Sequence, residues 1–130
     1  MKNLVIFIFS ILLVSCMGNE TSSKNYEAIS TTPITLKVGG VYAFKKEEST
    51  YYITKIIAID NFAVHIRSYS DTLSVKPNET FNTNKLNILL GHSPIDKKGY
   101  LSANPIYITE EPVIESELEG YKMYLEAMGN

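Results

Sequence analysis

The chain has 130 residues, with 12 Lys or Arg against 14 Asp or Glu and a single Cys. This length accommodates one domain, and a formal net charge of −2 at pH 7 argues against a nucleic-acid partner, which would need clustered cations. One Cys also excludes an intramolecular disulfide.

Residues 1–15 are predicted to be a signal peptide. Met1-Lys2 is a short basic start, and residues 4–14 (LVIFIFSILLV) form an apolar run interrupted only by Ser10. A helix of this length spans about 16 Å, whereas the hydrocarbon core of a bilayer is roughly 30 Å thick. The run therefore favours a secretion signal over a membrane span.

The end of this run carries a more specific signal. Leu13-Val14-Ser15-Cys16 resembles the lipobox of bacterial lipoproteins, in which small residues precede the Cys that becomes lipidated. The resemblance implies that the Cys16 thiol carries diacylglycerol, that a signal peptidase cuts before Cys16, and that the new amino terminus is commonly acylated too. Two or three acyl chains give stable anchoring.

The expected location is therefore the bacterial cell envelope, on a membrane reached through the lipid. In the enteric sorting pattern an Asp after the Cys retains a lipoprotein at the inner membrane. Met17 stands there instead, which favours the outer membrane. Residues 16–32, the lipidated Cys and a Ser/Thr/Asn-rich stretch, are predicted to be a flexible tether, and residues 33–130 a single domain.

The domain is expected to start with β structure. Residues 34–38 alternate as a strand, Gly39-Gly40 predicts a sharp bend or bulge, and residues 41–44 resume the strand. Residues 51–69 (YYITKIIAIDNFAVHIRSY) then predict a β-hairpin with Asp60-Asn61 as a two-residue loop.

This loop fixes the register of the hairpin. It predicts a core-facing side made of Ile53, Ile57, Ile59, Phe62, Val64 and Ile66. It predicts an opposite side made of Tyr52, Thr54, Ile56, Ala58, Ala63, His65, Arg67 and Tyr69. A slip of one residue would exchange the two sides.

The second half of the domain predicts a long polar loop over residues 70–85, a strand over 86–90, a turn over 96–99 and an edge strand over 105–108. A helix is expected over residues 116–128. Ser116 and Glu119 fit a capping box, and Gly129 lies where a C-cap glycine belongs. Gly120 inside this helix indicates close packing on the sheet.

The predicted fold class is mainly β with a C-terminal helix (α+β), either a small bent sheet or an SH3-like partly open barrel. Residues 63–69, 90–95 and 117–121 together resemble a recurring small bacterial domain of unassigned function. The resemblance covers residues 39–127 and implies one folded domain without implying an activity.

The candidate binding face consists of Tyr52, His65, Arg67 and Tyr69, which could hold an anionic or carbonyl-bearing ligand. The alternative is that the C-terminal helix covers this face and that Arg67 pairs with one of its Glu residues. His92 lies in a Gly-His-Ser-Pro turn as a candidate loop residue, where a His more often caps or packs than catalyses.

The motifs of common enzymes are absent from the sequence, including G-x-S-x-G, H-E-x-x-H and a phosphate-binding Gly loop. The sequence therefore favours a lipid-anchored, non-catalytic binding or structural module, without cofactor or metal, whose partner is a protein or an envelope component. An immunity protein against an interbacterial toxin is one alternative. A small hydrolase or metal-dependent enzyme using His65 and His92 is another, and close approach of both imidazoles to a carboxylate would favour it.

Asp71-Thr72-Leu73 also matches a bacterial O-glycosylation acceptor pattern, and its modification is left open.

Overall fold

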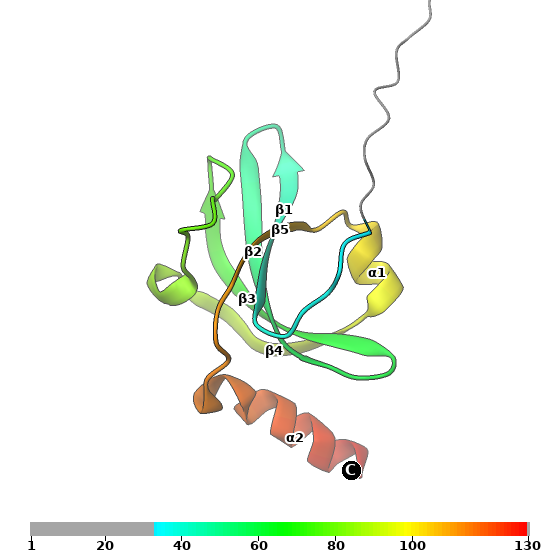
Figure 1. Ribbon diagram of the computed structural model, residues 1–130. Helices are drawn as coiled ribbons and strands as arrows, with labels where there is room; N and C mark the ends of the chain where they lie inside the picture. Colours follow the sequence, from blue (N-terminus) through cyan, green and yellow to red (C-terminus); the bar gives the residue numbers. More distant parts are fainter. Residues whose placement is uncertain (1–32, 130) are drawn as a thin grey trace, which may run out of the picture. The chain divides into compact units, whose positions relative to one another are not determined.

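The computed structural model describes residues 33–129, which belong to one compact unit (Figure 1). Five strands form one antiparallel sheet in the order β4-β3-β2-β1-β5. The strands are β1 (Gly40–Glu47), β2 (Thr50–Ile59), β3 (Ala63–Leu73), β4 (Ile88–Asp96) and β5 (Ile106–Glu110). The helical elements are η1 (Thr83–Lys85), α1 (Lys97–Ser102), η2 (Glu115–Leu118) and α2 (Glu119–Met128). This confirms the predicted class, mainly β with a C-terminal helix.

The predictions for residues 1–32, namely the signal peptide, Cys16 and the tether, lie outside the described residues. Within residues 33–129, none of the helices has the length and apolar character needed to cross a membrane.

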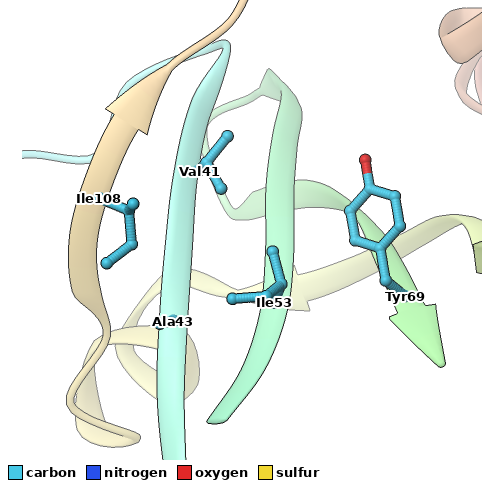
Figure 2. Close-up of a cluster of buried hydrophobic side chains, with 5 residues drawn as sticks. All are labelled: Val41, Ala43, Ile53, Tyr69 and Ile108. Carbon is cyan, nitrogen blue, oxygen red and sulfur yellow. The ribbon is translucent and has the colours of Figure 1, made fainter. Parts of the chain in front are cut away.

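The core lies on both faces of β1. One cluster consists of Val41, Ala43, Ile53, Tyr69 and Ile108, drawn from four strands (Figure 2). The other consists of Tyr42, Ile56, Val64, Ile66 and Tyr100, the last of which comes from α1. Because neighbouring residues of a strand point to opposite faces, Val41 and Tyr42 serve different clusters. Both are fully buried, so β1 is covered on its two sides.

The predicted two-residue hairpin loop is wrong. β2 ends at Ile59 and β3 begins at Ala63, and Ile59 pairs with Val64. The Asp60 side chain organises this longer turn, because its Oδ1 accepts the backbone N–H groups of Phe62 and Ala63, both at 2.7 Å. Phe62, expected in the core, lies at the tip and is 81% exposed.

The two predicted sides of the hairpin are also wrong, because β-bulges interrupt the alternation. The register of β2 and β3 shifts between Tyr52 and Thr54 and again between Ile56 and Ala58. Ile56 therefore joins the cluster of Val64 and Ile66, although it was expected on the other side. Tyr69 likewise joins Ile53. Each extra residue at a bulge reverses the faces that follow it.

Three of the shorter predictions also change. Residues 34–38 form no strand, although Gly39, with φ 83°, does make the expected bend. The strand expected at residues 86–90 begins at Ile88 and continues to Asp96, so His92 lies in a strand and not in a turn. The turn expected at residues 96–99 is the start of α1, where the Asp96 side chain accepts the Gly99 N–H at 2.9 Å. The edge strand is confirmed as β5.

The C-terminal helix begins as the 3₁₀ turn η2, and the capping box predicted for Ser116 and Glu119 is wrong. The reciprocal contact is made by Glu117, whose Oε2 accepts the Ile114 N–H at 3.0 Å while its own N–H bonds to Ile114 O at 3.0 Å. At the other end, Gly129 has φ 76° and its N–H bonds to Glu126 O, which confirms the predicted C-cap. A Cβ on Gly120 would lie 2.6 Å from the Cβ of His92, which confirms the predicted close packing.

Candidate functional site

The site is a hydrogen-bonded chain of three side chains, Asp60, His65 and His92. His65 lies on β3 and is 0% exposed. Its Nε2 is 2.8 Å from Asp60 Oδ2, and its Nδ1 is 2.9 Å from His92 Nε2. The two imidazole rings stack with centroids 5.1 Å apart and planes 10° apart. The chain therefore runs from the β2–β3 turn through β3 to β4.

Strand pairing brings these residues together. β3 and β4 are antiparallel and His65 faces Pro94, so His92, two residues before Pro94, is the diagonal neighbour of His65 on the same face. Asp60 belongs to the turn that its other carboxylate oxygen organises. One carboxylate thus fixes both the turn and the orientation of the buried imidazole.

The hydrogen bonds constrain the tautomers of the two histidines. The Ala63 N–H, the His65 side chain and the Phe62 N–H lower the pKa of Asp60 from 3.8 to about 2, so at neutral pH this carboxylate only accepts. His65 Nε2 must then donate to it. A neutral His65 accepts at Nδ1 from His92 Nε2, which leaves the lone pair of His92 Nδ1 as the basic end of the chain.

Burial, together with the neighbouring His65, lowers the pKa of His92. Both effects disfavour an added proton, because a cation loses hydration in this position and repels a second charge on the adjacent ring. His92 is thus held in its neutral form more strongly than a free histidine. A neutral His92 can serve as a base through Nδ1.

Two tyrosines of α2 cover the imidazoles. The Tyr121 and Tyr124 rings lie 4.5 Å and 5.0 Å from the His65 ring, centroid to centroid, and 6.0 Å and 5.5 Å from that of His92. Gly120 lets α2 come this close to β4. The helix is therefore part of the site and shields His65 from solvent.

A second polar cluster fixes the segment before α2. Lys55 on β2 is 3% exposed, and its Nζ lies 2.8 Å and 3.0 Å from the Glu117 oxygens and 2.8 Å from Pro112 O. Glu111 approaches Lys55 Nζ at 3.6 Å and accepts the backbone and hydroxyl donors of Thr83 at 2.7 Å and 2.6 Å. This buried ion pair ties η2 to the middle of the sheet.

The four residues of the predicted binding face do not form one exposed row. His65 is buried under α2, and Tyr69 is in the core. Arg67 lies with its Nη1 3.7 Å from Glu117 Oε1, which matches the alternative in which the C-terminal segment covers this face. Tyr52 lies apart from them, with Lys46 Nζ 5.3 Å from its ring centre. His92, expected in a turn, lies on β4 beside His65 and Gly120.

Three residues of these clusters were missed from the sequence as site residues. Asp60 was considered only as a turn residue, and Glu117 only as part of the helix start. Lys55 did carry a signal, because a lone Lys within the apolar run ITKIIAI has to be buried with a partner. Nothing in the sequence identified Glu117 as that partner.

The described residues contain no group of three or more His, Cys, Asp or Glu side chains placed to hold a metal ion. Comparison of the chain with protein-family models, with curated proteins and with solved structures finds no match.

Proposed function

We propose that this protein is a lipid-anchored component of the bacterial cell envelope whose β-rich domain binds another protein without catalysis. The lipid anchor is inferred from the apolar run of residues 4–14, which is followed by the chain's only Cys in the motif Leu13-Val14-Ser15-Cys16. A thiol consumed by lipid accounts for that Cys, and two or more acyl chains hold a domain on a membrane.

The surface of the domain supports the binding role. Ile88, Leu89 and Leu90 of the edge strand β4 are 52%, 62% and 52% exposed, and Met123 and Met128 of α2 are 70% and 61% exposed. An edge strand with a run of exposed apolar side chains is a template for pairing with another chain. Folded domains usually protect such an edge, so its exposure favours a partner.

The anchor is tested by changing Cys16→Ala in cells fed an alkyne-bearing fatty acid. The wild-type protein is expected to take up the label and to lose its first 15 residues, whereas the variant stays uncleaved and unlabelled because it lacks the acceptor thiol. Equal label on both proteins would contradict the anchor and, with it, the envelope location.

The binding role is tested by placing a photo-crosslinking amino acid at Leu89 in the full chain. Val75, which is 74% exposed in the loop after β3, serves as the matched control position. Ultraviolet light is expected to give a discrete adduct with an envelope protein from position 89 and none from position 75. The absence of an adduct at 89, or the same adduct at both positions, would contradict this role.

A small hydrolase is the second candidate, because the Asp60–His65–His92 chain ends in a basic imidazole nitrogen. It predicts that the full chain hydrolyses p-nitrophenyl acetate faster than free imidazole and that His92→Gln removes this excess without changing the melting temperature. We favour binding because Tyr121 and Tyr124 cover the chain and His65 is closed to solvent.

A further inference from the structure

A small pocket lies beside Glu117, between β3, the start of β4 and η2. Its volume is ≈ 180 Å³. Its polar lining includes Arg67, Thr83, Asn84 and Ser116, and its apolar lining includes Leu86 and Ile88. Sites for drug-sized ligands measure roughly 300–1,000 Å³, so this one fits a single small group.

Arg67 has unused hydrogen-bonding capacity in this pocket. Its side chain is 16% exposed, and among residues 33–129 its one ion-pair contact is Glu117 Oε1 at 3.7 Å, beyond hydrogen-bond length. In the same part of the chain, no side-chain nitrogen is both fully buried and without a partner. The free N–H groups of the guanidinium are therefore reached through the pocket.

Glu117 does not satisfy Arg67, because its oxygens are already occupied. Lys55 Nζ donates to both of them, and the Ile114 N–H donates to Oε2. Lys55 and Arg67 share the carboxylates of Glu111 and Glu117, and among these four described residues Arg67 is the one whose side chain makes no hydrogen bond. A planar carboxylate matches a guanidinium through two parallel hydrogen bonds.

The pocket also opens at the start of a free sheet edge. β4 is the last strand of the sheet, and three consecutive residues, Ile88–Leu90, are each more than half exposed. β4 carries an extra residue on each side of Leu90, where its pairing with β3 shifts register, and the three side chains of this bulged stretch are exposed. Ile88 both begins β4 and lines the pocket.

The direction of an added strand determines which end of the partner chain lies at the pocket. All pairs in this sheet are antiparallel, and a strand added antiparallel to β4 would have its carboxyl end at Ile88. Ile88 and Arg67 both line the pocket, so a chain that ends at Ile88 has its last carboxylate at the mouth of this pocket.

We propose that this pocket binds the C-terminal carboxylate of an extended segment of a partner protein, with the preceding residues pairing along Ile88–Gly91 of β4. The last side chain of that segment is small and apolar, because it lies against Leu86 and Ile88. The inference rests on the proposed function in that it assumes a protein partner, and it names the part of that partner which is recognised.

The test uses the full chain in detergent and a fluorescein-labelled pentapeptide, Thr-Val-Thr-Val-Val, with either a free carboxylate or a C-terminal amide. Fluorescence anisotropy is expected to show binding of the acid and at least about tenfold weaker binding of the amide, since a charge-assisted pair is lost. N-acetyl-valine, which lacks the strand residues, is expected to compete at least about tenfold more weakly than the unlabelled pentapeptide acid.

Three variants locate the site. Arg67→Met removes the guanidinium, and Ser116→Phe fills the pocket from an exposed position while keeping Arg67. Both are expected to weaken binding of the acid at least about tenfold. Arg67→Met should leave binding of the amide unchanged, whereas Ser116→Phe should weaken it as well, because the last side chain of the peptide loses its place beside Leu86 and Ile88. Lys85→Met removes an exposed charge of η1 outside the pocket and should bind like the wild type.

Equal affinity for acid and amide, or an unchanged Ser116→Phe variant, would overturn the carboxylate pocket. Equal competition by N-acetyl-valine and by the pentapeptide acid would overturn the pairing along β4. If either result appears while the crosslinker at Leu89 still captures an envelope protein, the inference fails and the proposed function stands.

Discussion

The carboxylate of Asp60 both closes a turn and orients a buried histidine. Its Oδ1 closes the β2–β3 turn and its Oδ2 orients His65. An Asn could keep the turn, because its carbonyl oxygen accepts the same N–H groups. It would not keep the tautomer of the imidazole, because its amide nitrogen is a donor facing His65 Nε2. The two tasks can therefore be separated by one substitution.

Asp60→Asn is expected to change the tautomer of His65 and the response of stability to acid. A carboxyl whose folded pKa is lowered from 3.8 to about 2 stabilises the fold above pH 3.8, and this contribution is lost as the pH falls towards 2. The variant should lose less stability than the wild type between about pH 4 and 2 in urea titrations. Nitrogen NMR should show the proton on Nε2 of His65 in the wild type and on Nδ1 in the variant. Parallel acid profiles for the two proteins would contradict this role.

Lys55 and Glu117 depend on each other for burial. Lys55→Met leaves Glu117 charged, buried and without its cation, which should cost about 3–5 kcal/mol of unfolding free energy. Adding Glu117→Leu should recover part of that loss, because the uncompensated charge is gone. Phe62→Ala is the control: at 81% exposure it should change stability by less than about 0.5 kcal/mol. Urea midpoints for the four proteins measure both effects, and a single Lys55→Met variant as stable as wild type would contradict the pairing.

At the scale of elements, α2 is held by close contact with β4 and by its two tyrosines. The helix itself has no fully buried residue, so its position depends on Tyr121, Tyr124 and the absence of a side chain at Gly120. Glu117 anchors the turn before it. The helix is thus fixed at its start and along one face.

Gly120→Ala should therefore destabilise the domain, although Ala is favoured over Gly in a helix by about 1 kcal/mol. The added Cβ would lie 2.6 Å from His92 Cβ, so α2 or β4 has to move. Gly91→Ala is the matched control, because a Cβ there meets nothing within 4 Å. Thermal unfolding should show a lower midpoint for Gly120→Ala and no loss for Gly91→Ala. A raised midpoint for Gly120→Ala would mean that the helix does not lie against His92.

Some features that depend on local sequence were predicted correctly, although the capping box at Ser116 and the strand at residues 34–38 were not. Gly129 and Gly120 were identified because a helix end and a close contact have their own residue preferences. The two faces of the hairpin were predicted wrongly. The bulges near Tyr52 and Ile57 and the turn at Asp60 depend on pairing and packing across the whole sheet. Phe62 was consequently placed in the core. The contact of His65 with His92 depends on the pairing of β3 with β4, which no local pattern encodes.

At the scale of the whole molecule, the buried polar groups of the described residues are hydrogen-bonded, whereas several large apolar side chains are exposed to solvent. Every fully buried side-chain nitrogen and oxygen among residues 33–129 has a hydrogen-bond partner. The exposed apolar side chains of β4 and α2 are not buried in the core. This distribution favours a domain that acts through its surface, in keeping with the proposed anchor at Cys16.

Intact-mass spectrometry of the protein purified from membranes tests the proposed anchor most directly. We predict a chain that begins at Cys16 and carries a diacylglyceryl group on its thiol, and the membrane fraction should contain no unmodified form. A chain that begins elsewhere, or one that begins at Cys16 with a free thiol, would contradict the account.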